Sequence, residues 1–117
     1  MIRLYDGELK LMELLWQHES IRAKDLSVLA AQAVGWNKNT TYTVLKKLVE
    51  KGAVCREEPG FLCTPLVRRE DVARAETDSL IGRLYGGSRR AFFASFLEDE
   101  RLSPQEIAEI RKLLEKR

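Results

Sequence analysis

The sequence predicts a mainly α-helical protein with one small β-hairpin, and three observations lead to this fold class. Apolar residues recur three and four positions apart in six segments, which is the spacing of one helix face. Glycine follows several of these segments, where it would end a helix. Residues 53–64 lack this spacing and carry Pro59-Gly60 between two short apolar runs, which predicts a hairpin.

Three helices are predicted in the N-terminal half. Residues 7–18 have a wide apolar stripe, which indicates a buried helix, and residues 20–22 form a short extended connection. A second helix ends at Gly35, and a third covers residues 38–51 with Asn37 as its N-cap. Three helices followed by a hairpin is the order of a winged helix-turn-helix domain.

The second half is predicted to be helical again, and Pro65 marks the boundary between a domain of residues 1–66 and one of residues 67–117. Helices are expected over residues 68–85, after Ser88, and after the capping box Ser103-Pro104-Gln105-Glu106. About 50 residues cannot bury so many apolar side chains alone, so we expect this domain to dimerise; the alternative is that it folds back onto the first domain. The expected dimerisation residues are Leu84, Phe92, Phe93, Phe96, Leu97, Ile107, Ile110 and Leu114.

The composition excludes several classes of protein. With 117 residues, of which 44% are hydrophobic and 32% charged, the chain suits one modest core and not a large multi-domain enzyme. It has no apolar run long enough to span a bilayer and no apolar signal segment, so we expect a cytoplasmic protein without membrane insertion. Cys55, Cys63 and His18 have neither the number nor the spacing of a zinc site, so no metal or other cofactor is expected.

The outward face of the third helix is the candidate binding surface. Asn39, Tyr42, Thr43, Lys46 and Glu50 fall on one face, flanked by further polar and basic side chains. Amide, phenol, hydroxyl and ammonium groups are those that contact phosphates and read base edges in a major groove. The charged residues of segment 36–56 are Lys38, Lys46, Lys47, Lys51 and Arg56, with Glu50 as the one acid.

This local excess of positive charge in a chain with a net charge of only +2 favours a surface that faces phosphate. The hairpin can carry Arg56 to the DNA backbone or into a neighbouring minor groove. An enzyme is disfavoured, because the chain has one histidine, no glycine-rich phosphate loop and no metal constellation. A winged helix that binds only another protein is the remaining alternative, and it would show little salt dependence.

Three blocks of the chain resemble the penicillinase-repressor family of bacterial transcription regulators, of the BlaI/MecI/CopY type. They are ELKLMELLWQHESIRAKDL, then WNKNTTYTVLKKLVEKG running into the hairpin, and the tail LYGG with SFLEDERLSPQEIAEIRKLLEKR. The resemblance implies a homodimeric repressor whose winged helices each read half of a palindromic operator in double-stranded DNA. The residues it would place on DNA are Asn37, Lys38, Asn39, Thr40, Tyr42, Thr43, Lys46, Lys47 and Arg56.

Similar regulators leave DNA after proteolytic cleavage controlled by a membrane sensor-protease, or in response to metal. The metal-responsive branch carries a C-terminal Cys-x-Cys pair, which is missing from the tail Leu113–Arg117, so copper sensing is disfavoured. The cleaved Asn-Phe bond of the penicillinase branch corresponds here to Ser95-Phe96. Serine replaces asparagine, which puts cleavage at this bond in doubt.

The two cysteines have two readings on the predicted hairpin. Cys55 and Cys63 lie directly opposite each other if the turn is centred on Pro59, and they are offset by one if Pro59-Gly60 is a two-residue turn. In the first register they could form a redox pair. The alternative, which we favour, is that both are reduced thiols that pack as small hydrophobic residues.

Overall fold

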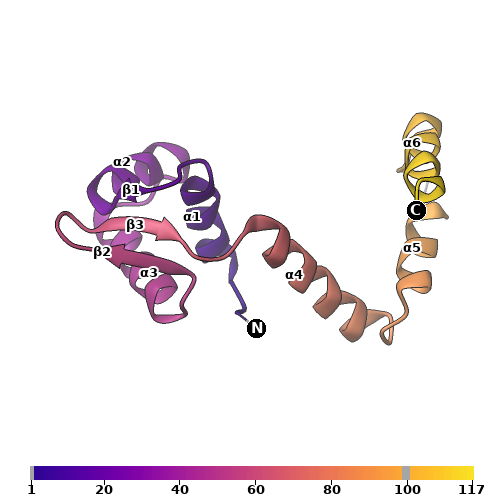
Figure 1. The fold of residues 1–117 in the computed structure, drawn as a ribbon, viewed down its shortest axis with the longest axis horizontal. Helices are drawn as coiled ribbons and strands as arrows, with labels where there is room; N and C mark the ends of the chain where they lie inside the picture. The colour runs from indigo at the N-terminus through magenta and orange to yellow at the C-terminus, as the bar shows by residue number, and fades with distance from the viewer. Residues whose placement is uncertain (1, 99–100) are drawn as a thin grey trace. The chain divides into compact units, whose positions relative to one another are not determined.

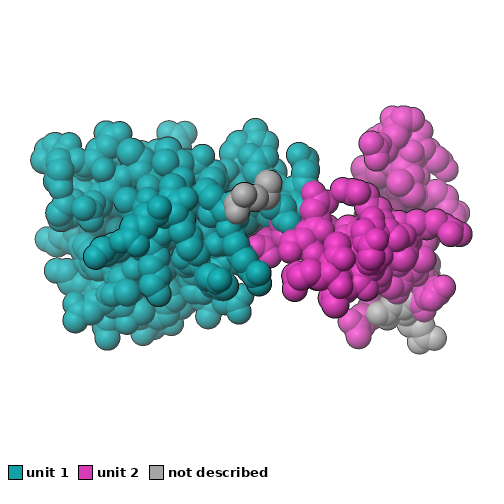
Figure 2. Space-filling model, turned by 90° about the horizontal axis from the view of Figure 1, so that it is seen from below, with its two compact units in different colours: residues 1–75 teal, residues 76–117 magenta. Residues whose placement is uncertain are grey.

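The computed structural model describes residues 2–98 and 101–117 and divides into two compact units, Met1–Ala75 and Glu76–Arg117 (Figure 2). The first unit contains three helices, a small sheet and the start of a fourth helix (Figure 1). Its elements are α1 (Asp6–Trp16), β1 (Ile21–Arg22), α2 (Ala23–Ala33), α3 (Lys38–Glu50), β2 (Val54–Glu57), β3 (Leu62–Pro65) and the first turns of α4 (Arg69–Leu84). The predicted winged helix-turn-helix is therefore confirmed.

The core of this unit lies where the three helices and the sheet meet. The apolar side chains that predicted the helices are the ones that become buried, because they share one face of each helix. Its largest fully buried side chains are Leu11, Met12, Leu15, Leu26, Leu45, Leu48, Val54, Thr41 and Cys63.

The sheet has a third strand that the sequence did not predict. Ile21 and Arg22, expected to be only an extended connection, form β1 and pair antiparallel with Cys63 and Leu62 of β3. The strand order is β1-β3-β2, so β3 is central. Two residues are too few for a periodic pattern, and their partners are about 40 positions further along the chain, so no local signal marks this strand.

The two compact units divide inside α4, between Ala75 and Glu76. Val72 belongs to the core of the first unit, and the Trp16 indole N–H donates a hydrogen bond of 2.9 Å to the Val67 carbonyl. Arg69 pairs with Glu13, and its guanidinium lies 5.2 Å from the centre of the Trp16 ring. The first turns of α4 therefore pack as part of the winged-helix unit.

The second unit comprises the rest of α4, α5 (Arg89–Leu97) and α6 (Pro104–Glu115). The predicted caps are confirmed, since the Ser88 hydroxyl accepts from Ala91 N–H at 3.0 Å and Ser103 accepts from Glu106 N–H at 3.1 Å. No described residue of α5 or α6 is buried. In the described part of this unit the one buried apolar side chain is Ile81.

Candidate nucleic-acid interface

The helix α3 is held with one face in the core and the other in solvent. The Asn37 side-chain oxygen accepts a hydrogen bond of 2.8 Å from Thr40 N–H, which satisfies one of the free donors at the start of the helix. On the inward face Thr41, Leu45 and Leu48 are each no more than 2% exposed. Thr41 is polar yet buried because its hydroxyl donates to the Asn37 carbonyl at 3.3 Å.

The outward face of α3, which we call the reading face, consists of Asn39, Tyr42, Thr43 and Lys46. With Lys38 and Phe61 these side chains line one shallow, open concavity of about 620 Å³. Asn39, Thr43 and Lys46 are exposed and Tyr42 is half-buried. The Thr43 hydroxyl donates to the Asn39 carbonyl at 2.9 Å, and the Lys38 ammonium lies 5.7 Å from the centre of the Tyr42 ring.

The other predicted helix residues lie beside this concavity. Asn37, Thr40 and Lys47 are exposed but do not line it. Within residues 2–98 and 101–117, no carboxylate pairs with Lys38, Lys46 or Lys47. An unpaired ammonium group keeps its full charge available to an incoming anion, so this face is suited to a polyanion such as DNA.

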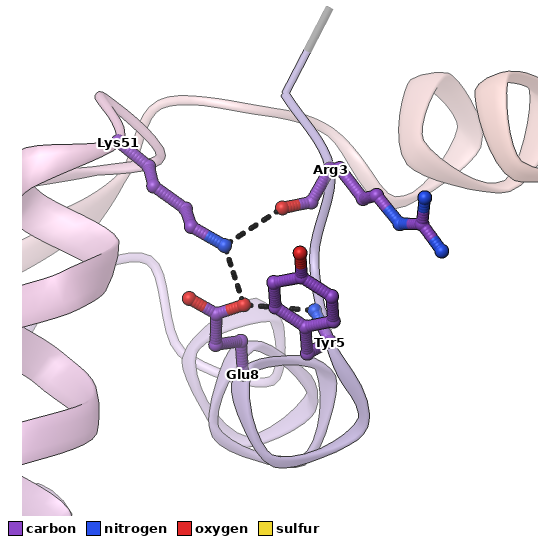
Figure 3. A network of polar contacts seen from close by, with 4 residues as sticks. All are labelled: Arg3, Tyr5, Glu8 and Lys51. Atoms are coloured by element: carbon purple, nitrogen blue, oxygen red, sulfur yellow. Dashed lines mark hydrogen bonds and ion pairs between the residues drawn. The ribbon is translucent and has the colours of Figure 1, made fainter.

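Lys51 differs from these lysines in its contacts, although it belongs to the same basic segment, residues 36–56. Its ammonium group donates to a Glu8 carboxylate oxygen at 2.6 Å and to the Arg3 carbonyl at 2.8 Å (Figure 3). It also lies 4.5 Å from the centre of the Tyr5 ring. Lys51 therefore anchors the end of α3 to the start of α1 and is a structural cation, which the charge count of the sequence could not distinguish.

The Glu8 side chain in this network is only 6% exposed. Burial alone would raise the pKa of the Glu8 carboxyl, but hydrogen bonds from Lys51 and from Tyr5 N–H, with the positive charge of Lys47, outweigh it and lower that pKa. Oε1 accepts both hydrogen bonds, while Oε2 is buried without a protein partner. Glu8 is thus ionised where it holds Lys51.

The wing consists of β2, β3 and the connecting residues 58–61. Arg56 is exposed on β2, and its guanidinium lies 4.8 Å from the centre of the Phe61 ring. This distance is in the range of a cation–π contact, which restrains the guanidinium at the tip of the wing. Phe61 has a φ of 51°, a conformation that bulky residues rarely adopt. No pattern in the sequence indicates that Phe61 lines the concavity together with the reading face.

The hairpin register does not bring the two cysteines together. Cys55 pairs with Thr64 and Arg56 pairs with Cys63, so the cysteines are offset by one, as in the two-residue-turn alternative. Directly paired residues point to the same face of a sheet, which places Cys55 and Cys63 on opposite faces. Both thiols are free. Burial raises the pKa of the Cys63 thiol, which keeps it protonated and poorly reactive.

The expected dimerisation residues of the second unit are largely exposed. Phe92 and Ile107 are half-buried, and the others are at least 37% exposed, with Leu84 at 70%. Phe92 contacts the rings of Tyr85, Phe93 and Phe96 edge-on, at centroid distances of 5.0 to 5.5 Å. These contacts align the aromatic residues of α5 without covering them.

Ser95, the first residue of the bond that corresponds to the family's cleavage site, lies within α5. Its hydroxyl donates to the Phe92 carbonyl at 2.6 Å and lies 3.1 Å from the Tyr85 hydroxyl. The Ser95-Phe96 bond is therefore part of a regular helix. Elsewhere, the described residues contain no cluster of three or more His, Cys, Asp and Glu side chains that could hold a metal ion, and no helix with the length and apolarity of a membrane span.

Three helices, a wing and an exposed polar and basic face on α3 define a winged helix-turn-helix protein of the type that binds DNA. The family model described as "Penicillinase repressor" matches residues 5–116. The chain belongs to the penicillinase repressor family.

Individual relatives agree with this membership. The chain is 30% identical to the penicillinase repressor of Bacillus licheniformis over 115 residues, covering 97% of this chain and 90% of the relative. It is 26% identical to the methicillin resistance regulatory protein MecI of Staphylococcus aureus (strain N315) over 113 residues, covering 95% and 92%. One of these relatives is named as a repressor and the other as a regulatory protein.

Two solved structures match the winged-helix part. The DNA-binding domain of the repressor BlaI in solution superimposes with a TM-score of 0.56 at 29% identity, covering 60% of this chain and 88% of that one. The monomeric form of Bacillus licheniformis BlaI in complex with the blaP half-operator gives a TM-score of 0.54 at 30% identity, covering 61% and 90%.

Proposed function

We propose that this protein represses transcription as a homodimer, each winged helix binding one half of a palindromic operator in double-stranded DNA. The observation that carries the proposal is the reading face on α3, where Asn39, Thr43 and Lys46 are exposed. Among the described residues, Lys46 has no carboxylate partner. A helix of this kind fits into a major groove, where amides and hydroxyls distinguish base pairs. The similarity to BlaI, a structure of which contains half-operator DNA, supports the same assignment.

The contacts divide by chemistry. Lys38, Lys46 and Lys47 supply phosphate attraction, which binds any duplex. Asn39, Tyr42 and Thr43 supply base discrimination, because their hydrogen-bonding groups can match the pattern of one sequence and not another. Arg56, restrained by Phe61 at the wing tip, contacts the backbone or the minor groove beside the helix. Asn37 and Thr40 lie at the start of α3 and flank the contacted groove.

Dimerisation through the second unit follows from its exposed apolar side chains. Unit 2 has one buried apolar side chain among its described residues, and a second copy could cover its aromatic and leucine side chains. A symmetric dimer presents two reading faces to the same side of DNA, which selects operators with two-fold symmetry. Domains of residues 1–66 and 67–117 separate these two tasks, with the first turns of α4 packing on the winged helix.

Release from DNA is proposed to require loss of the dimer, by proteolysis or by another signal. A membrane sensor-protease that cut Ser95-Phe96 would remove α6 and divide the aromatic residues of α5. Since this bond lies inside α5, a protease could reach it only after that helix unfolds locally.

The test is fluorescence anisotropy of the protein on pooled random duplexes over a salt series, followed by sequencing of the bound fraction. We expect salt-dependent binding, because released counterions dominate affinity for DNA, and enrichment of a two-fold-symmetric motif. Binding without salt dependence or enrichment would contradict the proposal and favour a winged helix that contacts only protein.

A further inference from the structure

A second concavity adjoins the reading face on its wing side. It is lined by Arg22, Lys24 and Asp25 from β1 and α2, by Gly60 and Phe61 from the wing, and by Tyr42 from α3. Tyr42 and Phe61 also line the concavity on the reading face, so the two hollows meet at this aromatic pair. Basic side chains therefore line the hollows on both sides of the Tyr42–Phe61 pair. Lys38 and Lys46 lie on one side, and Arg22 and Lys24 lie on the other.

The wing turn holds Arg22 in place. The backbone of Arg22 pairs with Leu62 of β3, and Ala23 N–H donates to the Phe61 carbonyl at 3.0 Å. A Cβ atom at Gly60 would lie 3.3 Å from Nη1 of Arg22, so the guanidinium packs directly against the turn. Gly60 also has a φ of +81°, which favours glycine, so this residue permits both the turn and the close approach of the arginine.

The residues that line this concavity keep a net positive charge. In the described part of the chain no carboxylate forms an ion pair with Arg22 or Lys24, although both are exposed. Asp25 lines the same surface and carries one negative charge, which leaves a net charge of +1 from these three residues. A ligand with a single negative charge and several acceptor oxygens fits this arrangement, and a phosphodiester has both properties.

We propose that Arg22 and Lys24 form a second phosphate-binding site, which holds the DNA backbone on the side of the Tyr42–Phe61 pair opposite Lys46. The proposal rests on the proposed function, because it names a further contact to the same DNA. The planar guanidinium of Arg22 can donate two hydrogen bonds to one phosphate, while Lys24 adds a point charge. The negative charge of Asp25 repels the phosphate that Arg22 and Lys24 attract, so Asp25 lowers the affinity of the protein for DNA of any sequence.

The first experiment compares R22Q and K24Q with K10Q, which removes a charge from an exposed lysine of α1 that lines neither concavity. Binding to an operator duplex and to a random duplex is measured by anisotropy over a salt series. We expect R22Q and K24Q to weaken binding to both duplexes about three- to tenfold. Each should reduce the slope of log K against log salt by at most about 0.9, the contribution of the one phosphate that both residues contact. K10Q should leave both quantities close to the wild-type values.

The variant D25N removes a negative charge from the same site, so its effect on DNA binding should be opposite to that of R22Q and K24Q. Removal of this carboxylate should tighten binding to both duplexes, which a general loss of structure would not do. R22Q and K24Q could bind DNA like K10Q while wild-type binding is salt-dependent and is weakened by K46A. In that case the proposal of a second phosphate-binding site is wrong, and the proposed function stands. If wild-type protein binds no duplex in a salt-dependent way, the proposed function itself fails.

A second experiment locates the phosphate. Single phosphates of the operator duplex are replaced by neutral methylphosphonates, one position at a time. At the phosphate that Arg22 contacts, the replacement should weaken DNA binding by the wild-type protein and by K46A. It should have little further effect on DNA binding by R22Q. A scan in which R22Q remains as sensitive as wild type at every position would overturn the assignment.

Discussion

Two lysines of the basic segment have opposite roles, and only their contacts distinguish them. Lys46 is exposed on the reading face and has no acidic partner among residues 2–98 and 101–117, whereas Lys51 is held by Glu8 at 2.6 Å and by the Arg3 carbonyl. The same side-chain type thus has a proposed role in binding in one place and a structural role in the other. The net charge of the segment overstates the charge that DNA would encounter by one unit.

Replacement of Lys46 by alanine should weaken binding to all duplexes and flatten the salt dependence, because one phosphate contact is lost. Asn39→Ala, on the same face, should instead reduce the ratio of operator to random affinity, by about 1 to 3 kcal/mol if the amide makes a bidentate base contact. Anisotropy on both duplexes measures the two effects. Unchanged binding of Lys46→Ala to random duplex would show that this lysine does not contact phosphate.

Glu8→Gln should destabilise the winged-helix unit by about 1 to 3 kcal/mol at pH 7, because it leaves the partly buried Lys51 without its counter-charge. The folded-state pKa of Glu8 is lowered, so its contribution is complete above the unfolded-state pKa and is lost as the pH falls through the folded-state value. The stability gap between wild type and Glu8→Gln should therefore narrow below about pH 5.

Urea unfolding at a series of pH values measures this gap. Glu19→Gln, which removes an exposed carboxylate from the α1–β1 connection, is the matched control and should change stability little at any pH. A gap for Glu8→Gln that is the same at pH 7 and pH 3 would contradict the assigned role of the ion pair.

At the scale of elements, the sequence predicted the helices well because their signals are local. Asn37, Ser88 and Ser103 are caps whose hydrogen bonds span three residues, and the apolar periodicity of α1 to α3 needs only a few turns. Strand β1 and the place of Phe61 beside the reading face depend on pairings between distant segments. Such pairings leave no pattern within either segment.

The candidate site divides in the same way. Asn39, Tyr42, Thr43 and Lys46 could be found from helical spacing alone, and the structure gathers them on one concavity. No local pattern indicates Arg22, because it precedes a helix by one position and comes to lie beside the wing only through the pairing of β1 with β3. The cysteine register also depended on the turn, which the sequence left open.

At the scale of the helix α5, Phe96→Asp should convert a dimer to a monomer. Phe96 is 47% exposed, and a charge there would remain unpaired in any interface that covers the aromatic residues. Sedimentation equilibrium measures the change, and Lys112→Asp on α6 controls for charge. A dimer that survives Phe96→Asp would place the interface elsewhere, with Leu114→Asp as the variant that then tests α6.

At the scale of the whole molecule, a chain of residues 1–75 should fold and bind DNA as a monomer, and it should be more stable than a chain of residues 1–66. The shorter chain loses the burial of Val72, the Trp16–Val67 hydrogen bond and the contact of Arg69 with Trp16. Together these are worth about 2 to 4 kcal/mol. Equal unfolding free energies of the two chains would contradict the packing of α4 on the first unit.

No described residue of α5 or α6 is buried, so the stability of these helices would depend on association and hence on gene dosage. A unit that gains its stability from association becomes more ordered as more copies are present, since mass action favours the assembled state. Occupancy of an operator by the proposed dimer would then rise more steeply than in proportion to the number of molecules in the cell. A modest fall in copy number, without any change in the individual molecules, would suffice to lift repression.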